Sequence, residues 1–109
     1  MSIEEIVEKV GEWWGYTAED FMETGDVKHE FAYAKYAYFV VATFNGYKQS
    51  EIIRHVGNKN RSSISRGVAQ MARLINRQGR YYYLIRDCLL DFGIRPVDVI
   101  EYVKLKRWK

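Results

Sequence analysis

The sequence predicts an all-α domain of about six or seven helices. Apolar side chains recur every three or four residues along most of the 109-residue chain, which is the spacing of one helix face. Residues that cap helices precede several of these segments, and glycines follow them. No segment predicts a strand, because the alternating stretch FAYAKYAYF is rich in alanine and continues into a helical pattern.

The N-terminal third predicts two helices. A capping box at Ser2 begins the first, which ends at Gly15. Thr17 can cap a short second helix, TAEDFME, which docks through Phe21 and ends at Gly25. The apolar face of the first helix consists of Ile3, Ile6, Val7, Val10, Trp13 and Trp14.

A third, longer helix is expected from about Val27 to Phe44. Alanines along it would permit close approach of neighbouring helices. These small residues are Ala32, Ala34 and Ala37. Its buried stripe is predicted to be Tyr36, Ala37, Val40, Val41 and Phe44.

The segment 47–68, YKQSEIIRHVGNKNRSSISRGV, predicts a helix, a turn and a second helix. The first runs from about Lys48 to Val56, and Gly57 is expected to supply a left-handed stop. Its inward residues are Ile52, Ile53 and Val56, and its solvent-facing residues are Lys48, Glu51 and Arg54. Asn60 is a good N-cap for the second helix, because its side-chain oxygen can accept an N–H of the first turn.

Two faces are distinct on this second helix. The buried stripe is predicted to be Ile64, Val68, Met71 and Ile75. The opposite side carries Arg61, Ser62, Ser65 and Arg66 near the helix start, where the N–H groups and helix dipole favour an anion. Phosphate is the expected ligand of this end.

The C-terminal part predicts two more helices. Gly79 separates a sixth helix, RYYYLIRDCLLDF, whose inner side is Tyr81, Leu84, Ile85 and Cys88. Pro96 opens a last helix to about residue 107, with Val97, Ile100 and Val103 or Lys104 at helical spacing. Because Cys88 is the only cysteine, it cannot form an internal disulfide, and we expect a buried, reduced thiol.

The charges of the chain are polarised. Residues 1–31 carry nine acidic residues against two lysines, whereas residues 32–109 carry fifteen basic residues against five acidic ones. Between Lys48 and Arg80 there are eight basic residues and one acid, Glu51. A polyanion would be steered to this part of the surface and away from the acidic third, although an ordinary solvated basic face is the other explanation.

Length and composition predict a single domain over residues 1–109, with one core. No run approaches the roughly 20 apolar residues that span a bilayer. The start, MSIEEIVEKV, is acidic where a secretory signal would be basic and then apolar. We therefore expect a cytoplasmic protein without a membrane partner.

From Ile3 to about Leu90 the chain resembles the C-terminal DNA-binding domain of the bacterial replication initiator DnaA, an all-helical member of the Trp-repressor-like group. EWWGYTAEDFM at positions 12–22 is similar to the family's Y-x-V-x-x-x-D-L-L stretch, and YAYFVVATF to the end of its connecting helix. FNGYKQSEIIRHVGNKNRSSI at positions 44–64 aligns without a gap with its helix-turn-helix. Residues 91–109 are an additional C-terminal helix beyond the family's domain.

The resemblance implies how the second helix of the motif would read double-stranded DNA. The family's R-D-H-T-T signature, which contacts bases and phosphates in the major groove, falls on Lys59, Asn60, Arg61, Ser62 and Ser63. Asn60 and Arg61 replace Asp and His, so the base preference should differ, because Asn pairs with adenine and Arg with guanine. The expected DNA-binding residues are Lys48, Gln49, Ser50, Lys59, Asn60, Arg61, Ser62, Ser63, Ser65 and Arg66.

The chain departs from the family at two points, which limit what the resemblance implies about its function. The family places a minor-groove arginine in the loop before the long helix, where this chain has Asp26 in ETGDVK, and a carboxylate there would repel DNA. The G-x-x-x-x-G-K-[ST] phosphate loop of the initiator's ATPase is missing from the sequence. We therefore expect a small replication or transcription regulator, or a mobile-element accessory.

The sequence does not favour an enzyme, and we expect no cofactor and no metal site. His29 and His55 have no carboxylate or cysteine at metal-ligand spacing. The acidic pairs Glu4/Glu5 and Glu19/Asp20 lie where they compensate helix dipoles.

The alternative function is a helical protein-interaction module, an adaptor or dimerisation domain without DNA binding. Nine tyrosines, three tryptophans and five phenylalanines are more than a small core needs, and tyrosine is favoured at interfaces. Tyr33, Tyr38, Tyr82 and Tyr83 are expected off the main stripes. The last helix could pack within the chain or form a homodimer contact.

Overall fold

A computed structural model describes residues 1–23, 29–57 and 60–107, without the side chains of residues 29 and 107. These residues form seven α-helices and one short 3-10 helix, with no strand among them, so the all-α prediction is confirmed. In chain order the elements are α1 (Ile3–Trp14), α2 (Ala18–Met22), α3 (His29–Phe44), α4 (Gln49–Ile52), η1 (Ile53–His55), α5 (Ser62–Arg77), α6 (Tyr82–Asp91) and α7 (Pro96–Arg107).

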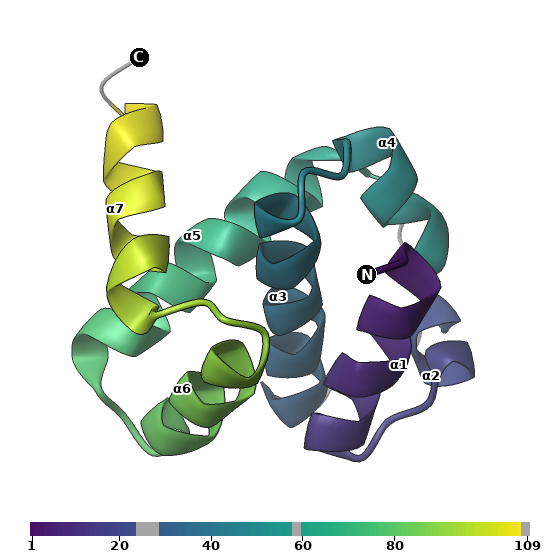
Figure 1. Cartoon of the computed structure of the whole chain (residues 1–109), viewed down its shortest axis with the longest axis horizontal. Helices are drawn as coiled ribbons and strands as arrows, with labels where there is room; N and C mark the ends of the chain where they lie inside the picture. Colours follow the sequence, from purple (N-terminus) through teal and green to yellow (C-terminus); the bar gives the residue numbers. More distant parts are fainter. Residues whose placement is uncertain (24–28, 58–59, 108–109) are drawn as a thin grey trace.

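Helix α3 lies at the centre of the fold, between α1 on one side and α5 on another (Figure 1). Seven of its residues are buried: Ala34, Ala37, Tyr38, Phe39, Val40, Val41 and Ala42. The predicted stripe is confirmed at Ala37, Val40 and Val41, but the buried surface of this helix is wider than that stripe. Tyr36 and Phe44 are only half-buried, whereas Tyr38 is fully buried, because neighbouring helices cover α3 on more than one side.

The first two helices begin as predicted, with reciprocal capping hydrogen bonds. The Glu5 N–H donates to Ser2 Oγ at 3.2 Å, and the Ser2 N–H donates to the Glu5 carboxylate at 3.3 Å. Thr17 and Asp20 exchange the same pair of bonds at the start of α2. Helix α1 ends at Gly15, which adopts the left-handed conformation with φ 80°. Local sequence thus determines both helix starts.

The boundary between α2 and α3 was only partly predictable. Phe21 is fully buried, as expected, and α2 ends at Met22. The predicted stop at Gly25 and the predicted start at Val27 lie outside the described residues, and α3 is described from His29.

The stop predicted at Gly57 comes one residue earlier, because the helical segment after α4 ends at Val56, whose backbone is extended. Gly79 separates α5 from α6 as predicted, and the left-handed residue between them is Gln78, with φ 48°. The amide of Gly57 donates to the Phe21 carbonyl at 3.0 Å, which ties the turn to α2.

Helices α3 and α5 cross closely at Gly67. This glycine is buried within α5, and a Cβ added there would lie 2.6 Å from Phe39 Cδ2 and 3.0 Å from Tyr36 Cδ1. The predicted stripe of α5 is confirmed, since Ile64, Val68, Met71 and Ile75 are all buried. The close crossing therefore sets how α5 is held on the core.

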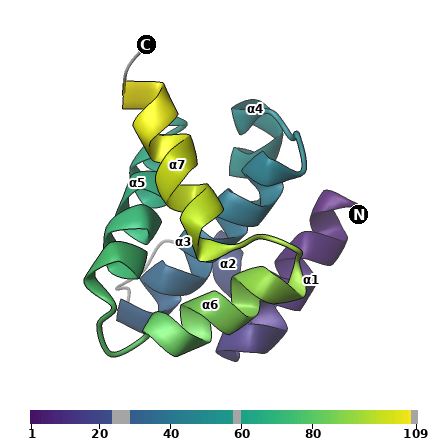
Figure 2. The same ribbon diagram turned by 60° about the vertical axis from the view of Figure 1, so that its left-hand side comes forward.

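The C-terminal helices complete the core. Cys88 of α6 is fully buried, which confirms the predicted buried thiol. In α7 Val99 is buried and Val97 is 45% exposed, because the helix turns the face with Val99 to α5 and α6. Figure 2 shows α7 crossing near α6 at its start, while its other end points away from the core. None of the described helices is both long enough and apolar enough to cross a bilayer.

We expect Gly67→Ala to destabilise the fold, although alanine favours helices. The added methyl group would overpack the α3–α5 crossing, at a cost of about 1–3 kcal/mol. The higher helix propensity of alanine stabilises the folded state by only about 1 kcal/mol. The free energy of unfolding, measured by denaturant titration, should fall by about 1 kcal/mol.

Gly79→Ala is the matched control, because a Cβ at Gly79 meets nothing within 4 Å. Its free energy of unfolding should stay within about 0.5 kcal/mol of the wild type. Equal stability of the two variants would show that the crossing is not tight at Gly67.

Burial raises the pKa of the Cys88 thiol from 9.0 to about 12. The folded core therefore holds the thiol in its neutral form. Below the pKa of about 9 that the thiol has in the unfolded chain, its contribution to the free energy of unfolding is complete, and that contribution declines as pH rises from about 9 to 12. We expect the stability difference between wild type and Cys88→Ala to shrink over that range. Denaturant titrations of both proteins at several pH values measure it, and a difference independent of pH would contradict the assignment.

Candidate nucleic-acid interface

The predicted helix, turn and helix are present as α4 with η1, the turn after Val56, and α5. The first helix is shorter than predicted, because only four residues are α-helical before the chain tightens into η1. Ile52, Ile53 and Val56 are buried as expected. Glu51 is half-buried and not fully in solvent, because its carboxylate accepts the Lys48 N–H at 3.0 Å.

Tyr38 connects this first helix to the centre of the fold. Its hydroxyl donates to the Ile52 carbonyl at 2.7 Å within the core. This position corrects the expectation that Tyr38 lies off the main stripe. Burial, with a smaller contribution from the charge of Glu4, raises the pKa of Tyr38, so the hydroxyl stays protonated and remains a donor.

The start of α5 is held by a network centred on Asn60. The side-chain oxygen of Asn60 accepts the Ser62 N–H at 3.0 Å and the Ser62 hydroxyl at 2.7 Å. The Ser63 hydroxyl donates to the Asn60 backbone carbonyl at 2.6 Å. Arg61 directly precedes α5 and makes no side-chain cap bond, whereas Asn60, one residue earlier, accepts an N–H of the first turn as predicted. The oxygen that a contact with adenine would need is thereby used.

The backbone of this first turn does not offer its N–H groups to a ligand. The amides of Ser62, Ser63 and Ile64 have acceptors on Asn60 and Arg61. These three N–H groups, which the sequence predicted to favour phosphate, are already bonded within the turn, so the side chains are the groups available to an anion here.

Arg66 is an exposed cation at this end whose side chain is held by hydrogen bonds. Its Nη2 donates to Ser62 Oγ at 2.8 Å, and its Nε lies 3.5 Å from the Ser62 carbonyl. The guanidinium is thus held along the outer face of α5 while it remains exposed. Such a preorganised cation gives up less side-chain entropy when it binds a ligand.

The expected DNA-binding residues fall into three groups. Those exposed to solvent are Lys48, Gln49, Asn60, Arg61, Ser62, Ser65 and Arg66. Ser50 and Ser63 are half-buried, and Lys59 lies outside the described residues, as does the loop with Asp26. The two helices meet directly, because Gln49 Nε2 donates to Ser65 Oγ at 3.0 Å.

Sequence reasoning missed two further cations on α5, Arg73 and Arg77. Both are exposed, and they follow Arg66 by seven and eleven residues, which places all three on one face of the helix. That spacing could have identified them, because it mirrors the spacing used for the buried stripe. The basic surface therefore extends along the length of α5.

A groove of about 740 Å³ opens beside the start of α5. It lies between the start of α4, the first half of α5, the end of α3 and the second half of α7. Its lining residues are Thr43, Tyr47, Lys48, Gln49, Ser50, Arg61, Ile64, Ser65, Val68, Ala69, Tyr102, Val103 and Lys106. Sequence reasoning missed Tyr102 and Lys106, because nothing local indicates that α7 faces α5.

The acidic N-terminal third reaches this region at one edge. His55 Nε2 lies 4.0 Å from the Glu4 carboxylate, and the Tyr47 hydroxyl donates to the Met1 carbonyl at 2.6 Å. The acidic third is therefore closer to the motif than the charge pattern suggested. None of its carboxylates lines the groove within the described parts of the chain.

No three described His, Cys, Asp or Glu side chains come together as a metal site would require. Comparison of the chain with protein-family models, with curated protein sequences and with solved structures finds no match. The function is therefore inferred from the residues and geometry of the interface.

We expect Tyr38→Phe to destabilise the fold and to loosen α4. The Ile52 carbonyl would remain buried without its donor, at a cost of about 1–3 kcal/mol in the free energy of unfolding. Tyr83→Phe is the matched control, because Tyr83 is 67% exposed and should change stability by less than about 0.5 kcal/mol. Denaturant titration of both variants tests this, and equal stabilities would rule out a structural role for the Tyr38 hydroxyl.

Proposed function

We propose that this protein binds double-stranded DNA through α5, as a small regulator or accessory of replication or transcription. The observation that carries the proposal is the outer face of α5, where exposed arginines recur from the second turn to the last. These are Arg66, Arg73 and Arg77, and the exposed Arg61 directly precedes the helix. A helix is about 10–12 Å across with its side chains, which suits the roughly 12 Å major groove of B-form DNA.

We assign phosphate and base contacts to individual side chains from the way in which the structure holds each of them. Arg66, held by Ser62 on the outer face of α5, is suited to a phosphate, since such contacts fix the protein's register on the duplex. Arg61 at the helix start is exposed and is our candidate for a guanine edge. The side-chain oxygen of Asn60 is already bonded at the start of the helix, so we assign adenine recognition neither to Asn60 nor to another residue.

The remaining contacts come from the helix before the turn. In helix-turn-helix proteins the first helix of the pair crosses the DNA backbone. Here that helix begins with exposed Lys48 and Gln49, and Gln49 is hydrogen-bonded to Ser65 of α5. The bond keeps the two predicted contact elements in a fixed relation, which supports binding of a rigid duplex.

Charge distribution supports the same proposal. The basic residues cluster from Lys48 to Arg80, and the acidic residues cluster in the first 31 positions. Long-range attraction would therefore orient the α5 face toward a polyanion during encounter. The resemblance to the DnaA C-terminal domain is consistent with this use, and a cytoplasmic location without catalytic activity belongs to the same proposal.

A protein-interaction module is the second candidate, and exposed apolar side chains favour it. Tyr83 is 67% exposed, Leu105 is 66% exposed and Leu90 is 48% exposed. All three belong to α6 and α7, and not to the basic face of α5. A pure interaction module would bind duplex DNA neither tightly nor in a salt-dependent manner.

We expect the double variant Arg61→Ala with Arg66→Ala to abolish duplex binding while the helical fold is kept. Removing two side chains that bind phosphates or bases should lower affinity by more than about tenfold. The slope of log affinity against log salt should become shallower by about 0.9 for each phosphate that the variant no longer neutralises. Fluorescence anisotropy with a labelled duplex measures both, and circular dichroism checks the fold.

Lys9→Ala is the control, because Lys9 is an exposed cation on the acidic helix α1. Its affinity and salt slope should remain close to those of the wild type. If the wild-type protein shows no salt-sensitive duplex binding, the proposed function is wrong.

A further inference from the structure

The groove between α5 and α7 has the chemistry of an anion site with an apolar floor. Its charged lining residues are Lys48, Arg61 and Lys106, and no described carboxylate lines it. Between these cations lie the apolar side chains Ile64, Val68, Ala69 and Val103. The cations come from three separate parts of the chain, the residue before α4, the residue before α5 and the second half of α7.

We propose that one sugar–phosphate strand of the bound duplex lies in this groove, and that α7 forms its outer wall. This inference rests on the proposed function and assigns a role to the C-terminal helix. Lys106 would contact the strand from the side opposite Lys48 and Arg61. The apolar floor would pack against the sugars, and Lys48 and Lys106 would complement the charge of their phosphates, while Arg61 stays the candidate for a base edge.

The position of the groove supports a nucleic-acid strand as its occupant. Five of its lining residues, Lys48, Gln49, Ser50, Arg61 and Ser65, are among those predicted to contact DNA. When α5 enters the major groove, the helix before it crosses a backbone strand, so that strand passes beside the start of α4. The groove is therefore continuous with the proposed duplex surface.

Helix α7 leaves the core toward its C-terminal end, and this divergence opens the groove. Val99 is fully buried, Tyr102 and Val103 are half-buried, and Lys106 is exposed. In Figure 2, α4 and α7 rise on the same side of the molecule and separate toward their upper ends. The inner face of α7 thus has packing partners in its first half and faces the groove in its second half.

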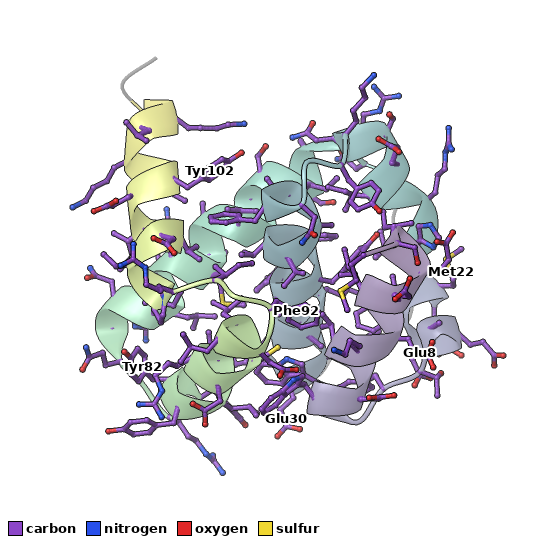
Figure 3. The ribbon with its side chains drawn as sticks, in the orientation of Figure 1. Glu8, Met22, Glu30, Tyr82, Phe92 and Tyr102 are labelled. Carbon is purple, nitrogen blue, oxygen red and sulfur yellow. The ribbon has the colours of Figure 1, made fainter. Side chains whose placement is uncertain are left out.

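Aromatic packing holds the second half of α7 in place. The Tyr102 ring lies 5.4 Å from the Phe44 ring, between centroids, and the Lys106 ammonium lies 5.3 Å from the centroid of Tyr102. Figure 3 shows Tyr102 on the side of α7 that faces the end of α3. The cation is therefore positioned beside the groove before any ligand binds.

The test compares two lysines of α7 in the full chain. Lys106→Gln removes a groove cation, whereas Lys104→Gln removes an equal charge from an exposed residue that does not line the groove. We expect Lys106→Gln to weaken duplex binding roughly fivefold at low salt and to make the salt slope shallower by about 0.9. Lys104→Gln should change affinity less than about twofold. Anisotropy titrations with the labelled duplex measure both.

The outcomes separate this inference from the proposed function. If the two lysine variants bind alike while the Arg61 and Arg66 double variant fails to bind, α7 is not a wall of the site and the DNA function stands. If the wild-type chain binds no duplex, both proposals fail together.

A second arm tests the other possible occupant, an acidic helix of a partner protein. The probe is a labelled amphipathic peptide with leucine at every third or fourth position and glutamate elsewhere. Binding of this peptide that depends on Lys106, with duplex affinity unchanged in Lys106→Gln, would overturn the strand proposal. Lys106-dependent duplex binding without such peptide binding would support it.

Discussion

The close crossing of α3 and α5 is the constraint on which the rest of the structure depends. Gly67 lets the two helices approach until the rings of Phe39 and Tyr36 lie where its side chain would be. Interiors are packed to crystal-like density, so this contact leaves little freedom in the position of α5. Because α3 is also covered by α1, a displacement at the crossing would reach the whole core.

The proposed DNA-binding surface is held in place by contacts with this core. The buried stripe of α5 faces inward, so the opposite face, with Arg66 and the later arginines, is directed to solvent. The Tyr38 hydroxyl holds the end of α4 from within α3, and Gln49 joins α4 to α5. Sites built on helices that are fixed by buried contacts keep their geometry better than sites on loops, which is what recognition of a regular duplex requires.

Local patterns predicted the elements well and the contacts between them less well. The capping box at Ser2 and the stripe from Ile64 to Ile75 were predictable, because neighbouring residues determine both. Tyr38 was assigned to the wrong environment, since helices packed from distant parts of the chain decide which face of a helix is covered. The capping role of Asn60 was predicted, whereas the two hydrogen bonds that its side-chain oxygen accepts from Ser62 show that this oxygen is already used.

The helices, several of their starts, the buried face of α5 and the polarity of charge follow from the amino-acid sequence alone. Each depends on residues within one or two helical turns, where the periodicity of side chains and the hydrogen bonding of helix ends act. That Thr43, Ser65 and Val103 line one groove, and that α7 faces α5, follows only from the packing of the folded chain. Those relations depend on how helices distant in sequence pack together, and packing is set by the combined shape of many side chains and not by the pattern of any one segment.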